Sequence, residues 1–131
     1  MHIDIDPASE IPIYQQVRDR IVEAIAAGEL PEGTPLASVR QVAGAFGINL
    51  ATVGKGYDLL RREGLVRTSR RGSFVARGPR SGPSTHGFGT RWRPRLRTLL
   101  AEAVAQGMTD ADVTAAVADE LRAFRTEGDR S

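Results

Sequence analysis

The chain lacks cysteine, is poor in aromatic residues and has no long apolar run, and each absence narrows what it can be. Without cysteine there is no disulfide framework and no thiolate metal site. Because aromatic residues make up only 5% of the chain, a core must be built mainly from Val, Ile, Leu and Ala. No stretch approaches the ~18 apolar residues of a membrane span, and the opening MHIDIDPASE is acidic where a secretory signal is basic. We therefore expect a cytoplasmic protein with no membrane partner.

Side chains arranged for catalysis are missing as well. The two histidines, His2 and His86, fall in a terminal arm and in a segment rich in glycine and proline. No H-x₃-H pair or carboxylate cluster accompanies either of them. Most serine and aspartate residues stand where they would cap helices. The sequence thus predicts no enzyme, no metal site and no cofactor.

The net charge of +2 conceals a strong asymmetry along the chain. Residues 1–54 and 98–131 each hold three Lys or Arg and seven Asp or Glu, a balance of −4. Residues 55–97 hold twelve basic and two acidic residues, a balance of +10. One basic block suits a surface that meets polyphosphate. Such a block can also be merely a solvated face, and its position relative to the helices has to distinguish these two interpretations.

The first half of the chain predicts an arm and three helices. Residues 1–11 are expected to be extended, and a first helix opens at Pro12 and ends at Gly28. Its buried stripe consists of Tyr14, Val17, Ile21 and Ile25. The second helix starts at a capping box formed by Ser38 and Gln41. Its apolar face consists of Val39, Val42, Ala43 and Phe46.

A tight turn separates the second helix from the third. Gly47 ends one and Asn49 caps the next, so the two helices must turn sharply against each other, as in a helix-turn-helix. On the third helix the inner side consists of Val53, Tyr57 and Leu60, and the outer side of Ala51, Lys55, Asp58 and Arg62, with Thr52 on its flank. Small and polar residues followed by a cation suit a helix whose start enters the major groove. The alternative is an ordinary amphipathic helix with a solvated outer face.

A basic hairpin is expected after the third helix. Two short β-prone runs, 65–69 and 73–77, flank the sequence Arg70-Arg71-Gly72, in which the glycine is free to adopt a positive φ. Two arginines at the tip of a hairpin form a wing that can reach a minor groove or a phosphate. This tip favours contact with an anion.

Residues 78–94 predict a mobile linker, because four glycines and three prolines interrupt them without any periodicity. Two helices follow, the first opening at Pro94 and ending at Gly107, the second capped by Thr109. Two helices cannot form a closed hydrophobic core alone, so a two-fold dimer is expected through their apolar faces. The residues expected there are Leu96, Leu99, Leu100, Val104, Val113, Val117, Leu121 and Phe124. The alternative is that the pair folds back on its own winged domain. No pocket for an effector is evident in this short tail.

Residues 10–77 resemble the GntR family of bacterial regulators. The family pattern is approximately L-P-S-x-R-x-L-A, G-V-x-x-x-T-V-x-x-A-Y-x-x-L, E-G-L-V and G-x-G-T-F-V. The chain has PLASVRQVA, GINLATVGKGYDLL, EGLV and RRGSFV at the corresponding places. The opening D-P-x-S-x-x-P-I-Y-x-Q and the short tail resemble the YtrA-type subfamily. That resemblance implies dimerisation through about two C-terminal helices and repression of the protein's own operon, often one encoding an ABC transporter.

The resemblance also implies roles for single residues. Arg40 and Thr52 match positions that contact DNA, Lys55 stands where the subfamily keeps a cation, and Gly72 matches the wing glycine. Two departures are Ala37 in place of proline and Arg70 in place of the first wing glycine. Leu50 and Gly54 stand where many family members outside the subfamily have base-reading arginines, and Leu50 and Ala51 replace the Pro-Asn common in YtrA-type proteins. The third helix therefore offers fewer base-reading groups than is usual in the family.

These observations predict a mainly α fold with a small β-hairpin wing. It consists of a winged helix-turn-helix at 1–77, a flexible linker at 78–94 and a two-helix dimerisation region at 95–127. The expected function is that of a homodimeric repressor that binds a two-fold operator in double-stranded DNA, with no effector assigned. The expected DNA-binding residues are Ser38, Arg40, Asn49, Ala51, Thr52, Lys55, Tyr57, Arg62, Arg70, Arg71 and Gly72. The alternative is a winged-helix module that binds protein or RNA.

Overall fold

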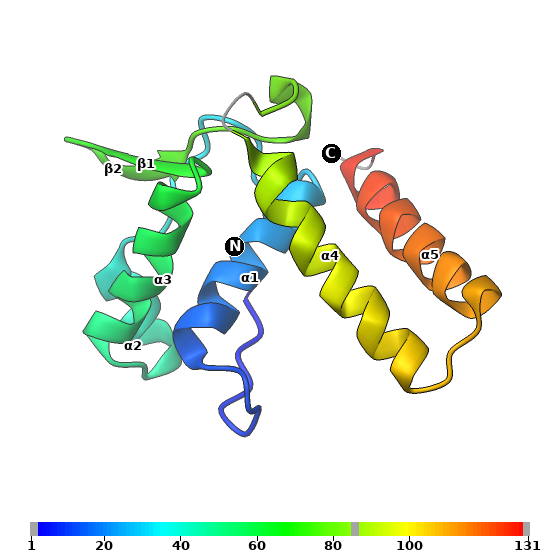
Figure 1. Ribbon diagram of the computed structural model, residues 1–131. Helices are drawn as coiled ribbons and strands as arrows, with labels where there is room; N and C mark the ends of the chain where they lie inside the picture. Colours follow the sequence, from blue (N-terminus) through cyan, green and yellow to red (C-terminus); the bar gives the residue numbers. More distant parts are fainter. Residues whose placement is uncertain (1–2, 85–86, 130–131) are drawn as a thin grey trace.

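The computed structural model describes residues 3–84 and 87–129. Its elements are α1 (Ile13–Ala26), α2 (Val39–Phe46), α3 (Leu50–Arg62), β1 (Val66–Ser69), β2 (Gly72–Val75), the short 3₁₀ turn η1 (Pro79–Ser81), α4 (Phe88–Ala105) and α5 (Asp110–Asp129). Figure 1 shows α1, α2, α3 and the hairpin gathered on one side, with α4 and α5 as an antiparallel pair on the other. This arrangement confirms the predicted mainly helical fold with a β-hairpin wing. Among the described helices, none combines the length and apolar character needed to cross a membrane.

The helix-turn-helix forms as its capping residues predict. The hydroxyl of Ser38 accepts from the backbone N–H of Gln41 at 3.1 Å, and the Gln41 side chain accepts from the backbone N–H of Ser38 at 2.8 Å. Gly47 adopts a left-handed conformation with φ of 63°, which ends α2. Asn49 then caps α3 by accepting from the backbone N–H of Ala51 at 2.8 Å. Local hydrogen bonding therefore fixes both ends of the turn.

Two expectations about these helices need correction. Helix α1 begins at Ile13, with Pro12 as the preceding cap residue, so it opens one residue later than expected. Phe46 was expected on the buried face of α2, but its side chain is 41% exposed, whereas Val42 and Ala43 are buried. The prediction was wrong because an apolar stripe shows which face turns inward, not how far along the helix the core extends.

Helices α1 and α3 pack closely because α3 carries glycine where they meet. A Cβ atom added at Gly56 would lie 2.8 Å from the backbone oxygen of Tyr14 and 3.2 Å from a methyl group of Val17. The same contact buries Val17, Ile21, Val53, Tyr57 and Leu60 completely. Gly56 thus permits an approach that any larger residue would obstruct.

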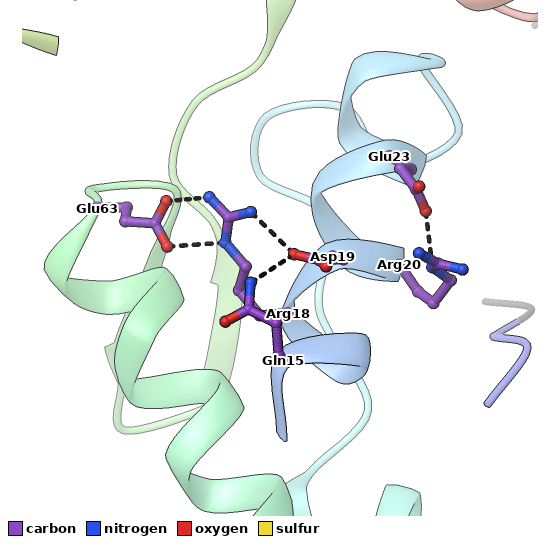
Figure 2. Close-up of polar contacts among 6 residues, drawn as sticks. All are labelled: Gln15, Arg18, Asp19, Arg20, Glu23 and Glu63. Carbon is purple, nitrogen blue, oxygen red and sulfur yellow. Dashed lines mark hydrogen bonds and ion pairs between the residues drawn. The ribbon is translucent and has the colours of Figure 1, made fainter. Parts of the chain in front are cut away.

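An ion pair joins the same two helices at the C-terminal end of α3. Figure 2 shows the guanidinium of Arg18 facing both carboxylate oxygens of Glu63, with Nε donating to Oε1 at 2.9 Å and Nη2 donating to Oε2. Arg18 also donates to Asp19 at 3.0 Å, and its side chain is only 13% exposed. The hydrogen bond to Glu63 is the main reason why the pKa of Arg18 lies above its ordinary value. Since two parallel bonds fix both distance and orientation, this pair holds the end of α3 against α1.

The N-terminal arm is fastened to α1 by a buried glutamine. The side chain of Gln16 accepts from the backbone N–H of Asp6 at 2.8 Å and donates to the carbonyls of Asp6 and Ile11 at 2.9 and 2.8 Å. Ile3, at the start of the described chain, is buried in the core. The arm is therefore a packed part of the winged domain.

The wing is a short antiparallel hairpin with one edge covered. Val66 pairs with Val75, Thr68 with Ser73, and a two-residue turn of arginines joins the strands. Gly72, which was predicted to use its conformational freedom here, has φ of 114°. The backbone of residues 33–36 runs along the outer edge of β2 with three hydrogen bonds of 2.8–2.9 Å. Since an isolated two-stranded hairpin is marginally stable, this additional pairing supports the wing.

The predicted linker is wrong over its second half. Helix α4 begins at Phe88, and Pro94 lies inside it rather than at its start. A proline there lacks the N–H that would bond to the carbonyl of Thr90, but a single lost bond does not break a helix of 18 residues. The 3₁₀ turn η1 also orders residues 79–81 of the expected linker. His2 and His86 lie outside the described residues.

Several large apolar side chains of helices α4 and α5 are exposed to solvent. Among the side chains that the structure describes in these two helices, none is buried. Leu99 and Val104 are each 63% exposed and Leu121 is 52% exposed. Helix α5 also touches α1, so the pair does rest on its own winged domain, yet this contact does not cover those side chains.

The close packing at Gly56 leads to a stability prediction. We expect Gly56→Ala to lower the free energy of unfolding by about 1–3 kcal/mol, because the added methyl group meets the Tyr14 carbonyl. Gly54→Ala is the matched control, since nothing lies within 4 Å of its added Cβ. That control is expected to stabilise the protein by roughly 0.5–1 kcal/mol through helix propensity. Denaturant unfolding of both variants measures the difference, and equal stabilities would contradict the close approach.

Candidate nucleic-acid interface

The outward face of α3 is polar and accessible. Ala51, Lys55 and Arg62 are exposed and Thr52 is half-buried, as expected of a helix that enters a groove. Arg40 is exposed near the start of α2. Ser38 and Asn49 are exposed too, but their side-chain oxygens accept the capping bonds of α2 and α3. These two residues position the starts of both helices.

Tyr57 cannot contact DNA directly, which corrects its place among the expected DNA-binding residues. Its side chain is fully buried, and its hydroxyl donates to the carbonyl of Ala37 at 2.6 Å. Burial raises the pKa of Tyr57 to about 12, so the hydroxyl stays a donor at neutral pH. The residue lies on the inner face of α3 with Val53 and Leu60. Its bond ties the recognition helix to the segment before α2.

Lys55 leans back toward α1. Its ammonium nitrogen lies 3.9 Å from the centre of the Tyr14 ring, within the range of a cation–π interaction. The lysine is otherwise exposed, at the junction of α1 and α3. The ring therefore restricts a flexible side chain to one part of the outward surface.

Exposed arginines continue this surface from α3 into the wing. Arg70 and Arg71 form the hairpin turn, and Arg67 lies on the exposed side of β1. The hydroxyl of Ser69 accepts from the backbone N–H of Arg71 at 3.2 Å, which orders the turn. These exposed cations of α3 and the hairpin are called the basic surface: Lys55, Arg62, Arg67, Arg70 and Arg71.

Arg61 is a residue that the sequence reasoning missed. It bonds to Asp58 on its own helix and to Thr68 and Ser73 in the hairpin. The three-residue spacing of Asp58 and Arg61 is a signal that the sequence contains. The contact with the hairpin depends on how the strands fold back, so no local pattern could reveal it.

A cleft of about 720 Å³ lies between the winged domain and α5. Its walls include Pro31 and Glu32 from the loop after α1, Arg80 from η1, and Phe124 from α5. The tail was expected to have no evident pocket, and this needs correction because the two parts of the chain form the cleft jointly. Among the described residues, no group of three or more His, Cys, Asp or Glu side chains could hold a metal ion.

A helix-turn-helix followed by a two-stranded basic wing defines a winged-helix DNA-binding protein. Residues 13–75 match the family described as bacterial regulatory proteins, gntR family. The chain is 34% identical to the transcriptional repressor YtrA of Bacillus subtilis (strain 168) over 107 residues, which cover 81% of this chain and 82% of that protein. It belongs to the GntR family. The family resemblance predicted from the motifs is confirmed.

Other similar proteins are a repressor and two solved structures. The repressor NagR of Bacillus subtilis (strain 168) is 40% identical over 76 residues, 57% of this chain and 31% of that protein. The solved structure of YtrA from Sulfolobus acidocaldarius is 37% identical, with a TM-score of 0.62 over 79% of this chain and 97% of that one. A crystal structure from Listeria monocytogenes EGD-e, described as a transcriptional antiterminator, is 26% identical with a TM-score of 0.82 over 92% and 93%.

These likenesses identify the chain as a DNA-binding transcriptional regulator, since the relatives are named as regulators and repressors rather than enzymes. The match to the YtrA repressor covers 107 residues, more than the winged helix-turn-helix contains. The matched region therefore extends beyond the winged helix-turn-helix and includes α4.

Proposed function

We propose that the protein is a homodimeric repressor that binds a two-fold operator in double-stranded DNA. The observation that carries this proposal is the basic surface, whose exposed cations lie on the outward face of α3 and in the hairpin up to its turn. Cations at both places suit simultaneous contact with a major groove and with the neighbouring minor groove or phosphates. Similarity to two named repressors supports repression, rather than activation, of transcription.

The dimer rests on the open apolar side chains of α4 and α5. Leu99, Val104 and Leu121 are each more than half exposed, and Val117 is 45% exposed. A second copy related by a two-fold axis would offer the same surface and cover all four. Leu96, Leu100, Val113 and Phe124, also expected at this interface, are already half-buried within one chain. The exposed members therefore contribute most of the new burial.

The wing and the phosphates contribute much of the affinity in this proposal, because the recognition helix is poor in base-reading groups. Its outward first turns offer Ala51, Thr52 and Lys55. Nothing lies within 4 Å of a Cβ added at Gly54, so the helix backbone can approach DNA closely there. Specificity then depends on the wing and on the half-site spacing that a dimer sets.

The regulated gene is proposed from the YtrA-type resemblance. Repression of the protein's own operon, often one encoding an ABC transporter, is the behaviour that this resemblance implies. No effector is assigned. The rival function, a winged-helix module for RNA or protein, is separated by the DNA-binding measurements below.

Two substitutions test the basic contacts. Arg40→Ala and Lys55→Ala are each expected to weaken binding to operator duplex by about 1–3 kcal/mol and to lower the salt slope by about one, because each removes a cation facing DNA. Arg122→Ala is the control, since Arg122 lies on α5 and is 70% exposed. Titrations at several salt concentrations measure this. Unchanged affinity in both variants, or tighter binding to single-stranded RNA than to duplex, would count against the proposal.

A second pair of variants tests the dimer. Val117→Asp combined with Leu121→Asp should give monomers that bind the operator at least ~10-fold more weakly, because charges replace apolar contacts. Ala115→Asp, on the opposite side of α5, should leave the dimer intact. Sedimentation velocity measures the mass of each variant. A dimer that survives the double substitution would place the interface elsewhere.

A further inference from the structure

The exposed half of the wing extends beyond the hydrophobic core. Val66 and Val75 pair at the base of the hairpin and are 1% and 0% exposed. Side chains alternate along a strand, so Thr68 and Ser73 lie on the same hairpin face as these valines, one step nearer the tip. Thr68 is exposed. Apolar packing therefore ends at the valine pair, before the turn that carries the arginines.

Arg61 connects this outer pair to the recognition helix. Its Nε donates to the hydroxyl of Thr68 at 2.7 Å, and its Nη2 donates to the hydroxyl of Ser73 at 3.4 Å. The two hydroxyls are themselves 3.3 Å apart. On the other side, Nη1 donates to the carboxylate of Asp58 at 2.7 Å. One planar guanidinium thus bonds to α3, β1 and β2 at once.

We propose that Arg61 is a positioning residue that fixes the wing relative to α3. The valine pair holds the base of the hairpin, and the backbone of residues 33–36 pairs with β2 as far as Ser73. Neither contact ties the outer part of β1 to α3. The bonds of Arg61 to Thr68 and Ser73 add this direct tie to α3 and limit the movement of the outer part of the hairpin relative to that helix. Arg70 and Arg71 stand directly beyond this attachment, so their distance from the groove-reading side of α3 depends on it.

A direct contact between Arg61 and phosphate explains these observations less well. Of the five N–H donors of a guanidinium, three already have partners within the protein. Asp58 also offsets its charge, at an N–O distance of 2.7 Å. This arrangement accounts for an acidic residue on the outward face of a DNA-binding helix, where it would otherwise repel phosphate. Asp58 orients the arginine.

The first test uses the free protein and needs no DNA. Thr68→Val removes the acceptor hydroxyl without changing the charge or the strand propensity. Arg61→Lys keeps the positive charge but removes the planar guanidinium that bonds to several partners at once. Each should lower the NMR order parameters of the backbone amides of residues 70–72, from a value near ~0.85 toward ~0.6. Arg62→Lys is the matched control and should leave them unchanged. Order parameters like those of the wild type in both test variants would overturn the proposal.

The second test measures binding to operator duplex and rests on the proposed contact of the wing with DNA. Thr68→Val and Arg61→Lys should each weaken binding about 3- to 10-fold, the equivalent of one or two lost hydrogen bonds. The double variant should be no weaker than either single one, because both break the same attachment. Wild-type affinity in both single variants, together with a lower salt slope in Arg61→Ala, would show a phosphate contact and overturn the proposal.

A separate double variant shows whether the wing contacts DNA at all. If Arg70→Ala combined with Arg71→Ala binds DNA like the wild type, the wing does not contact the operator. Reduced order parameters in Thr68→Val would still support the attachment made by Arg61.

Discussion

The position of α3 against α1 is the constraint on which the rest of the winged domain depends. Gly56 brings the two helices together over the backbone of Tyr14, and the pairing of Arg18 with Glu63 holds the end of α3 (Figure 2). Because the inner face of α3 is fixed in this way, its outer face is fixed too, and Arg61 bonds this helix to the hairpin that follows. The same contact places Lys55 over the Tyr14 ring. One helix crossing therefore determines where the outward residues of α3 lie, and it also places Lys55 beside α1.

The two parts of the chain are held by different forces, and this difference suits their proposed tasks. The winged domain has its own buried core and several specific polar contacts, so a single chain can present a rigid DNA-binding surface. The C-terminal helices, an antiparallel pair beside the winged domain (Figure 1), have no buried side chain among those described, and Leu99, Val104 and Leu121 are more than half exposed. A second copy that covers these side chains would hold two winged domains at a fixed spacing. In a protein whose recognition helix has few base-reading side chains, such spacing supplies specificity that a single domain lacks.

The sequence predicted the features that arise from local chemistry. Ser38, Gln41 and Asn49 cap helices as expected, and Gly72 adopts a positive φ at the tip of the wing. Two predictions failed for other reasons. Tyr57 was placed among the DNA-binding residues because it matches a family motif, although helical spacing puts it on the inner side of the third helix, where it is buried. Pro94 was predicted to start a helix, but α4 begins at Phe88 and continues through it. The bonds that Arg61 makes to the hairpin and that Gln16 makes to the arm depend on how neighbouring elements fold against one another, so no local pattern indicates them.

The central claim is that two copies read an operator through α3 and the wing, with the C-terminal helices setting the spacing. Hydroxyl-radical footprinting of the dimer on DNA from upstream of its own gene tests this most directly. The account predicts two protected half-sites related by a two-fold axis, about one helical turn (~10 base pairs) or a multiple apart, each with a protected minor groove where the wing lies. A single protected half-site, or no protected site in that DNA, would contradict it.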